Sequence, residues 1–395
     1  MSSAVLIADR SLETTAAGST AILSLGLRDF RNYAALKLRL SGRPVVLTGP
    51  NGAGKTNILE ALSFFSPGRG LRRARLSEVS RHAGTGCWAA HAEVACAVGP
   101  IAIGTGLAEP AGAEDGGERR IVRINGEPAA SAAGLTEYLD VVWLTPQMDR
   151  LFVEGVSTRR RFMDRLVYGL DSGYARQLAA YERAMRERNR LLKQGGADPA
   201  WLTALEGQMA EHGLAVAAAR RDGLARIEAG MALAAGPFPR ARLAVRGTIE
   251  AWLEEMPALA AEEKFRAMLR ERRNIDRDAG AATEGPHRSD LAVWHAEKAQ
   301  AAEQCSTGEQ KALLIAITLA NARLIRARRQ MAPLMLLDEV SAHLDGRRRA
   351  ALYEELLALG GQAWLTGTDE TLFSDLEGRA EFFTVMDGVV TPGHA

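Results

Sequence analysis

A glycine-rich segment has the residue types and the spacing of a phosphate-binding loop. It fits the pattern G-x-x-x-x-G-K-[ST] and lies between a predicted strand and a predicted helix. Glycines allow backbone N–H groups to converge on phosphate oxygens, and the positive end of the helix faces the same point. We expect Lys55 to contact the β- and γ-phosphates of ATP and Thr56 to hold Mg²⁺. The residues expected to bind ATP are Gly49, Pro50, Asn51, Gly52, Ala53, Gly54, Lys55, Thr56 and Asn57.

Two carboxylates that follow an apolar run supply a second part of the chemistry. Residues 334–337 predict a buried strand, and Asp338 and Glu339 come directly after it. Beside a phosphate-binding loop, the first carboxylate suits a Mg²⁺ ligand and the second suits a general base for the attacking water. We therefore predict catalytic roles for Glu339 and Lys55, and metal binding by Asp338 and Thr56.

A third segment resembles the serine-glycine signature of ABC-type ATPases. It comes just before a predicted helix, and a serine hydroxyl with free backbone N–H groups at a helix N-terminus makes an anion site. The resemblance implies that the segment caps the γ-phosphate of ATP held by a partner subunit, so that two chains enclose two ATP molecules head to tail. Its residues are Ser306, Thr307, Gly308, Glu309 and Gln310.

Further segments resemble the remaining loops of an ABC-type site. Gln147 follows a predicted strand and precedes the helical region, so it is the candidate for the Q-loop, where it would contribute to the Mg²⁺ site. The position of the switch histidine of ABC transporters reads Thr366-Gly367-Thr368-Asp369, so that histidine is missing. The segment that resembles the D-loop, which lines the dimer interface, consists of Ser341, Ala342, His343, Leu344 and Asp345.

The elements that must position these residues alternate between strands and helices. Apolar runs predict strands at residues 21–25, 36–40, 44–48, 121–124, 141–144, 334–337, 363–366 and 382–386, and helices at 57–65, 307–328 and 346–359. Asn125-Gly126 predicts a hairpin turn. Residues 156–277 have helical spacing, and the breaks at Gly195-Gly196 and Gly236-Pro237 limit each helix to roughly 20–30 residues. The pattern predicts an α/β fold, a parallel-containing sheet with an inserted helical lobe, and no long coiled coil.

The same pattern divides the chain into four segments. Residues 1–20 are small and polar and are expected to be a flexible extension, and residues 109–118 are expected to be a loop. Residues 21–150 are expected to be the N-terminal part of an ATPase lobe, residues 151–280 a helical second lobe, and residues 281–395 the C-terminal part of the ATPase lobe.

Composition excludes several classes of protein. The 395 residues are 47% apolar and 25% charged, which excludes a largely disordered chain. The net charge of +1 gives no global basic field that would indicate nucleic-acid binding, so any such binding must come from local patches. The longest uncharged stretches fall short of the about 20 apolar residues of a membrane span. Three cysteines without metal or disulfide spacing are expected to be thiols in a reducing cytoplasm.

The ordered set of motifs resembles the RecF family of bacterial recombination mediators. The resemblance spans residues 22 to 370, and Gln147 and the N-terminal extension depart from the family pattern. Besides the ATPase motifs, it is carried by Leu27-Arg28-Asp29-Phe30-Arg31-Asn32-Tyr33, Asn57-Ile58-Leu59-Glu60-Ala61, Arg159-Arg160-Arg161-Phe162-Met163-Asp164 and Gly285-Pro286-His287-Arg288-Ser289-Asp290-Leu291.

The resemblance implies an ABC-type ATPase head with a helical second lobe, and it implies function. Members bind ATP, dimerise and engage DNA at single-strand gaps and single-strand/double-strand junctions. With RecO and RecR they help to load the recombinase. We therefore expect a slow, DNA-stimulated ATPase that works as a switch in the cytoplasm, with ATP and Mg²⁺ as cofactors.

A basic segment is the candidate DNA-binding site. Between Arg159 and Lys193, Lys and Arg outnumber Asp and Glu ten to four, and Arg159, Arg160 and Arg161 begin that run. Arginine-rich helix faces can follow phosphates, but the same run is also typical of a solvated helix with ion pairs between successive turns. His287 and Arg288 resemble the family, and the sequence gives no role for them beyond a buried, hydrogen-bonded histidine.

Three other functions compete with this interpretation. The ATPase subunit of a transporter is more compact between Lys55 and Ser306 and keeps the switch histidine. An overcoming-lysogenisation-type nuclease needs an acidic metal cluster after the ATPase core, and the stretch after Asp345 is too short for one. The possibility of another SMC-related ATPase stays open. A scaffold with a dead nucleotide site conflicts with the intact Lys55, Asp338 and Ser306.

Overall fold

Two groups of residues pack as compact units in this structure, a computed structural model that describes residues 20–107, 118–196, 198–234 and 236–393. The first unit runs as far as Met148 and resumes at Ala322, and the second comprises Asp149–Asn321. Nearly all of the expected N-terminal extension and of the expected loop at 109–118 lies outside the described residues. Within those residues, no helix has both the length and the apolarity needed to cross a bilayer.

The first unit contains a mostly parallel sheet built from short apolar strands. Every residue of β3, β8, β12 and β13 is buried, as expected for strands that are covered on both faces. The strand order is β15-β14-β3-β13-β12-β8, and all pairs are parallel except β14–β15. The strands are β3 (Val45–Thr48), β8 (Val141–Leu144), β12 (Leu334–Leu337), β13 (Ala363–Gly367), β14 (Glu381–Met386) and β15 (Val389–Pro392).

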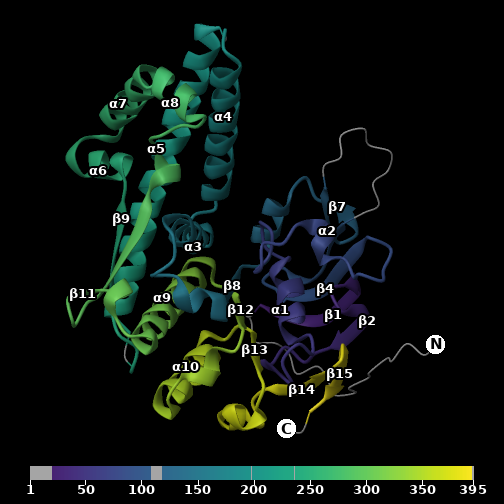
Figure 1. Ribbon diagram of the computed structural model, residues 1–395. Helices are drawn as coiled ribbons and strands as arrows, with labels where there is room; N and C mark the ends of the chain where they lie inside the picture. The colour runs from purple at the N-terminus through teal and green to yellow at the C-terminus, as the bar shows by residue number, and fades with distance from the viewer. Residues whose placement is uncertain (1–19, 108–117, 197, 235, 394–395) are drawn as a thin grey trace. The chain divides into compact units, whose positions relative to one another are not determined.

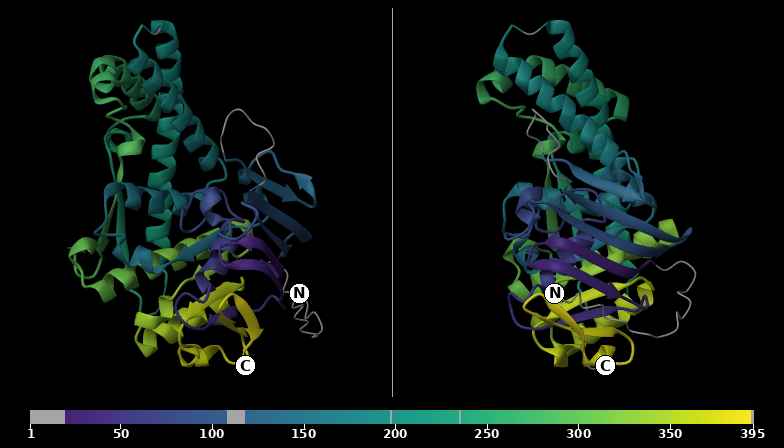
Figure 2. Two further views of the ribbon diagram at one scale, coloured as in Figure 1. Left: turned by 45° about the vertical axis from the view of Figure 1, so that its right-hand side comes forward. Right: turned by 90° about the vertical axis from the view of Figure 1, so that its right-hand side faces the viewer.

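A second, antiparallel sheet in the same unit has the order β2-β1-β4-β5-β6-β7. Its strands β1, β2, β4 and β5 lie side by side in the right-hand view of Figure 2, in purple and blue. Asn125 and Gly126 both have positive φ, 51° and 85°, which confirms the predicted hairpin turn. The strands are β1 (Ala21–Phe30), β2 (Tyr33–Arg39), β4 (Trp88–Cys96), β5 (Gly99–Leu107), β6 (Arg120–Ile124) and β7 (Glu127–Pro128).

Helix α1 (Lys55–Ser63) packs in the hydrophobic core that the two sheets share. Its buried Ile58 and Leu62 belong to one cluster with Phe30 of β1 and Leu47 of β3. This burial fixes the helix that follows the glycine-rich loop. The other helices of the unit are α2 (Leu76–Val79) and α10 (Gly346–Leu359), and α9 (Thr307–Arg329) begins in the second unit and ends in the first.

The second unit is largely helical, as its composition predicts. Helices α4 and α5 pack along each other, joined by a short link that contains Gly195-Gly196 (Figure 1). Helix α5 has 34 residues, longer than predicted, because only single glycines interrupt its sequence. The helices are α3 (Val156–Tyr168), α4 (Tyr174–Gln194), α5 (Pro199–Ala232), α6 (Thr248–Glu255), α7 (Ala258–Glu271) and α8 (Arg273–Ala279).

A small three-stranded sheet in the second unit differs from the sequence prediction. Strand β9 (Ala241–Arg246) lies in the region predicted to be helical throughout, and it pairs antiparallel with β10 (Asp290–His295), which also pairs with β11 (Gln300–Ala301). This pairing ties residues 290–301 to β9, and residues 281–321 belong to the second unit, whereas the sequence division placed them in the ATPase lobe. The difference arises because β9 finds its partner far away along the chain, which its local sequence does not reveal.

Candidate nucleotide-binding site

The glycine-rich loop follows β3 and needs glycine at two positions. Gly49 and Gly54 have φ of 145° and 116°, a region that strains residues with a side chain. A Cβ atom on Gly49 would lie 2.1 Å from the carbonyl oxygen of Val385, and one on Gly54 would lie 2.5 Å from the Asn32 side chain. The loop is thus pressed between β14 and the β1–β2 turn, and its backbone path depends on both glycines.

Lys55 lies with its ammonium group over the loop. Its Nζ donates to the carbonyl oxygens of Gly49 at 2.7 Å and Pro50 at 2.9 Å, and the side chain is buried. Burial lowers the pKa of Lys55, while the negative charges of Glu339 and Asp338 act in the opposite direction. The loop, the cation and the two carboxylates therefore belong to one electrostatic site.

A hydroxyl and a carboxylate that are far apart in sequence meet at the end of the sheet. Thr56 Oγ1 donates to both carboxylate oxygens of Asp338, at 2.9 and 3.1 Å. β3 and β12 end at the same edge of the sheet with β13 between them, which brings the two residues together. Hard cations such as Mg²⁺ prefer oxygen ligands, and this pair supplies them.

Thr366, at the end of β13, is a site residue that the sequence analysis missed. Its buried hydroxyl donates to Asp338 Oδ1 at 2.7 Å and accepts from the backbone N–H of Glu339 at 3.0 Å. It occupies the stretch where a switch histidine was absent. The signal was its place at the end of the predicted strand 363–366, which in the structure neighbours β12.

Glu339 has a left-handed backbone conformation, with φ of 51°. Such a conformation costs a residue with a side chain of order 1–3 kcal/mol and persists only where the surroundings hold it. Here the hydrogen bond from Glu339 N to Thr366 provides part of that restraint. Strain of this kind gathers at functional sites, which is consistent with the predicted catalytic role of Glu339.

Asn32 and Tyr33, at the β1–β2 turn, support the glycine-rich loop. The buried Tyr33 hydroxyl donates to the carbonyl oxygen of Gly54 at 3.1 Å, and Asn32 Nδ2 donates to that of Ala53 at 3.2 Å. Asn57 Nδ2 in turn donates to Asn32 Oδ1 at 2.7 Å. Burial raises the pKa of Tyr33, so its hydroxyl stays a donor. The sequence pointed to this segment through family resemblance alone.

A buried carboxylate on α1 joins two loops to the site. Glu60 is fully buried, and Arg31 contacts both of its oxygens, at 2.6 and 2.8 Å. Arg72 donates to Glu60 Oε2 at 2.9 Å and to Asn57 Oδ1 at 2.6 Å. The positive charges of two guanidinium groups thus compensate the charge of one fully buried carboxylate, and these contacts fix the first turns of α1.

The signature segment forms the N-terminus of α9 in the second unit. Ser306 caps the helix reciprocally: its N–H donates to Glu309 Oε2 at 2.9 Å, and Glu309 N–H donates to Ser306 Oγ at 3.4 Å. Ser306, Thr307 and Gly308 are exposed, and Gln310 Nε2 donates to the carbonyl oxygen of Cys305. Lys298 pairs with Glu309, and this contact, followed by those to Ser306, lowers the pKa of Glu309 to about 2.

The D-loop and Q-loop candidates lie in the first unit. Ser341 is buried and its hydroxyl accepts from Tyr353 at 2.9 Å, while Asp345 caps α10 by accepting from Arg348 N–H. Gln147 is exposed, three residues after Leu144, whose carbonyl oxygen accepts from the Asp338 N–H. Gln147 is therefore placed near the carboxyl end of β8, next to β12, and its metal role stays a prediction.

The three candidate DNA-binding arginines have different surroundings. Arg159 makes a two-pronged ion pair with Asp290, with both contacts at 2.7 Å, and also donates to the carbonyl oxygen of Glu154. Arg160 is half-buried and donates to the carbonyl oxygen of Ser289, whereas Arg161 is exposed. Of the three, Arg159 is already matched by a carboxylate.

Comparisons with known proteins match most of the chain. The family described as RecF/RecN/SMC N terminal domain matches residues 21–391. The DNA replication and repair protein RecF of Mesorhizobium japonicum is 52% identical over 94% of this chain and 98% of that protein. The protein of the same name from Brucella suis is 51% identical over 94% and 96%.

Solved structures show the same fold. The structure described as the recombination mediator protein RecF-ATPrS in the RecFOR pathway has a TM-score of 0.82 and 22% identity, covering 96% of this chain and 100% of that one. The Smc head domain of Pyrococcus furiosus has a TM-score of 0.51 and 16% identity, covering 94% and 95%. The predicted fold, an ABC-type ATPase head with a helical lobe, is confirmed.

Proposed function

We propose, from the premise that this chain belongs to the RecF family of DNA replication and repair proteins, that it is a DNA-binding ATPase of recombinational repair. The observation that carries the ATPase part is the meeting of Thr56 and Asp338 beside Lys55. A glycine-rich loop, a buried cation and an oxygen pair are the parts that a Mg²⁺–ATP site requires.

The residues at the end of the sheet fit Mg²⁺ together with ATP. Thr56 Oγ1 and the Asp338 carboxylate offer hard oxygen ligands, and the Thr366 hydroxyl orients the carboxylate by donating to its Oδ1. When bound, the ion neutralises charge on the β- and γ-phosphates. Lys55 places its ammonium group on the same phosphates, and the backbone N–H groups of residues 49–56 complete the cradle.

Glu339 is the proposed general base. Its carboxylate accepts a proton from the attacking water while the γ-phosphoryl group transfers to that water, and ADP leaves. The hydrogen bond from Thr366 to Asp338 and that from Glu339 N to Thr366 fix the metal ligand and the base relative to each other. Hydrolysis is slow and stimulated by DNA, so ATP serves as a switch.

A second chain completes each site in this proposal. The exposed Ser306 hydroxyl and the N-terminus of α9 cap the γ-phosphate of ATP that the partner's loop holds, and residues 341–345 line the same interface. Support comes from the exposure of residues 306–308 at a helix N-terminus. Lys298 offsets the negative charge of Glu309 there, which would otherwise repel a phosphate.

The proposed targets are gapped DNA and single-strand/double-strand junctions, and the proposed partners are RecR and RecO. One structural relative is described as a mediator in the RecFOR pathway. On this basis, the ATP-bound dimer holds DNA in the cytoplasm while RecO and RecR load the recombinase. Arginines 159–161 of α3 were the sequence candidates for the DNA contact.

One experiment tests the function as a whole. ATP turnover and sedimentation are measured for the full chain with ATP, ADP or no nucleotide, with and without gapped duplex DNA. The proposal expects ATP, and not ADP, to produce dimers, and gapped DNA to raise turnover. A chain that turns over ATP at the same rate with and without DNA, and that stays monomeric with ATP, would contradict it.

A further inference from the structure

The turn at Gly285-Pro286-His287-Arg288 in the second unit has no role in the nucleotide site. We propose that Arg288, together with Arg160 and Arg161 of α3, forms a surface that binds phosphate groups of the DNA backbone, and that Arg159 holds this surface together without contacting DNA. The inference rests on the DNA binding proposed above. It assigns that binding to particular guanidinium groups. Among the proposed DNA-binding residues, Arg288 takes the place of Arg159.

The backbone of the turn is rigid. Gly285 has φ of 133°, and a Cβ atom there would lie 2.4 Å from the Tyr181 hydroxyl. The carbonyl oxygen of the buried Pro286 accepts from Arg220 Nη1 at 2.6 Å, and Arg288 N–H donates back to Gly285 at 2.9 Å. The turn therefore presents Arg288 from a fixed position.

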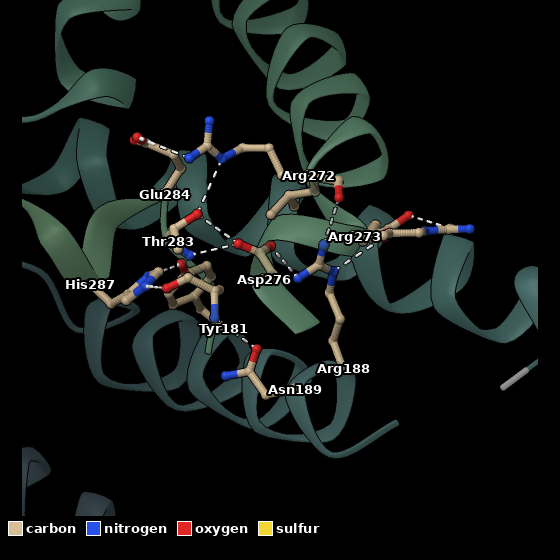
Figure 3. Close-up of polar contacts among 12 residues, drawn as sticks. Tyr181, Arg188, Asn189, Arg272, Arg273, Asp276, Thr283, Glu284 and His287 are labelled. Carbon is tan, nitrogen blue, oxygen red and sulfur yellow. Dashed lines mark hydrogen bonds and ion pairs between the residues drawn. The ribbon is translucent and has the colours of Figure 1, made fainter. Parts of the chain in front are cut away.

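His287 stabilises this turn through hydrogen bonds at both ring nitrogens. Figure 3 shows its ring between Tyr181 and the segment that leads into the turn. Nδ1 lies 2.6 Å from the Tyr181 hydroxyl, and Nε2 lies 2.8 Å from the carbonyl oxygen of Ala282. Burial lowers the pKa of His287, so the ring is neutral at pH 7: Nε2–H donates and Nδ1 accepts. Both nitrogens are engaged, which leaves Arg288 as the residue of the pair that can reach a ligand.

A buried charged network fixes the segment just before the turn. Asp276 accepts from Arg188 Nη1 at 2.7 Å through one oxygen, and from the backbone N–H and hydroxyl of Thr283 through the other (Figure 3). Asn189 Oδ1 accepts from Ala282 N–H at 2.9 Å. These contacts anchor residues 282–283 to α4 and α8, so the support of the turn extends into the core of the unit.

Helix α3 brings further arginines to the end of the turn. Arg160 Nη1 donates to the carbonyl oxygen of Ser289, and Arg159 pairs with Asp290. Arg161 follows on the same helix and is exposed. Burial lowers the pKa of Arg160, and the positive charges of Arg220, Arg161 and Arg288 act in the same direction, against the opposite effect of Asp164. Arg160 thus reaches the end of the turn beside Arg288, and the charge of Arg161 acts on it from the same helix.

Two of the nearby carboxylates are occupied. Asp290 is taken by both prongs of Arg159, and Asp164 accepts from Arg220 and from the Tyr174 hydroxyl. The Arg288 side chain is exposed, and its guanidinium group makes no hydrogen bond or ion pair with the residues that the structure describes. Local positive charge is therefore left uncompensated, and planar guanidinium groups suit phosphate oxygens. Contacts of this kind carry no base information, so the surface binds DNA of any sequence.

The test compares the binding of labelled gapped duplex DNA across a salt series. The variants are Arg288→Ala, Arg161→Ala and the double variant, with Arg183→Ala as the matched control, because Arg183 is exposed on α4 of the same unit. Each lost phosphate contact should reduce the slope of log K against log salt by roughly 0.9, so the double variant should lose roughly 1.8. The affinity for DNA should fall several-fold in each single variant and stay at the parental value in Arg183→Ala. The affinity for ATP should stay at the parental value in all of them.

Arg288→Lys provides a second measurement, because it keeps the charge and removes the planar fork. It should keep the parental salt slope with a smaller loss of affinity than Arg288→Ala. A parental slope in Arg288→Ala, while the parent binds DNA, overturns the inference alone. Loss of ATP-dependent dimerisation with unchanged DNA binding also overturns it and assigns the turn to an interface. A parent chain that binds no DNA overturns the proposed function together with the inference.

Discussion

The hydroxyl of Thr366 donates to Asp338 Oδ1 at 2.7 Å, so the strand beside β12 contributes directly to the orientation of the carboxylate that follows β12. The same hydroxyl accepts from Glu339 N–H, and it therefore connects the metal ligand to the proposed base. One side chain sets the geometry of two others with different chemistry.

Replacing Thr366 by Val should impair hydrolysis more than ATP binding. The methyl group keeps the buried volume but removes one donor to Asp338, which keeps Thr56, and leaves the Glu339 N–H without its partner. Hydrogen bonds to charged groups contribute about 1.5–3 kcal/mol. We expect kcat to fall about tenfold or more and the Mg²⁺ requirement to rise. Steady-state turnover across a Mg²⁺ titration measures both, with Thr366→Ser as the control that keeps the hydroxyl. Equal turnover in the Val and Ser variants would mean that the hydroxyl has no role.

Glu339→Gln should separate ATP binding from hydrolysis. The amide preserves shape but cannot accept the proton of the attacking water, and general bases contribute about 10²–10⁴-fold. ATP binding should be retained, the ATP-bound dimer should persist, and DNA should dissociate more slowly. Single-turnover assays with labelled ATP give the rate, and Lys55→Met, which should not bind ATP stably, is the matched negative control. Hydrolysis at the parental rate would assign the base elsewhere.

Mixed dimers should reveal whether two chains share the site. Ser306→Arg should leave ATP binding by the monomer intact and block dimerisation, because a bulky cation takes the space of the γ-phosphate. In a mixture with Lys55→Met chains, one site carries both lesions and the other carries neither. Turnover should then recover in part, up to the fraction of mixed dimers. Normal dimerisation of Ser306→Arg alone would contradict a shared site.

Lys298→Met should change the charge at the N-terminus of α9. The pair with Lys298 is the largest cause of the low pKa of Glu309, about 2 against an ordinary 4.5. A lowered folded pKa stabilises the fold above about pH 4.5, and that contribution is lost as the pH falls toward 2. Carboxyl NMR titration should show the Glu309 midpoint rising in the variant. ATP-dependent dimerisation should weaken, while ATP binding by the monomer should stay unchanged. An unchanged titration midpoint of Glu309 would show that Lys298 does not lower its pKa.

Arg159→Ala should destabilise the second unit without changing the DNA salt slope. Arg159 and Asp290 are largely buried and paired through two contacts, so their loss removes a matched pair. A double-mutant cycle with Asp290→Ala should give a coupling free energy of about 1 kcal/mol. Urea unfolding measures it, with the exposed Arg161→Ala as the control that should leave stability within about 0.5 kcal/mol. A flattened salt slope in Arg159→Ala would return this residue to the DNA-binding surface.

Contiguous motifs were predictable from the sequence because their chemistry lies in neighbouring residues. The loop at Gly49–Thr56, the buried strand before Asp338 and the capped helix at Ser306 all appear where predicted. Buried parallel strands were equally clear, since each contains a continuous run of three or four apolar residues.

Features set by distant contacts were not predictable. Nothing around Thr366 reveals that its hydroxyl meets Asp338, and nothing around Ala241–Arg246 reveals its pairing with β10. The arginine run at 159–161 indicated positive charge but did not reveal the partners of these side chains. The ion pair with Asp290 gives Arg159 a structural role that Arg160 and Arg161 do not share. Pairing between residues that are far apart in the chain determines these features, and a single sequence contains little information about such pairing.

The strand order of the parallel sheet has a consequence for biosynthesis. Val45 of β3, the strand that leads into the glycine-rich loop, pairs with Trp364 of β13 on one side and with Glu381 of β14 on the other. During translation both neighbours of β3 leave the ribosome hundreds of residues after it does. The second unit, continuous in sequence, can condense earlier, whereas the loop waits until nearly all of the described chain has been made. A nascent chain therefore gains its nucleotide site last, and a truncated product would carry the loop sequence without the sheet that shapes it.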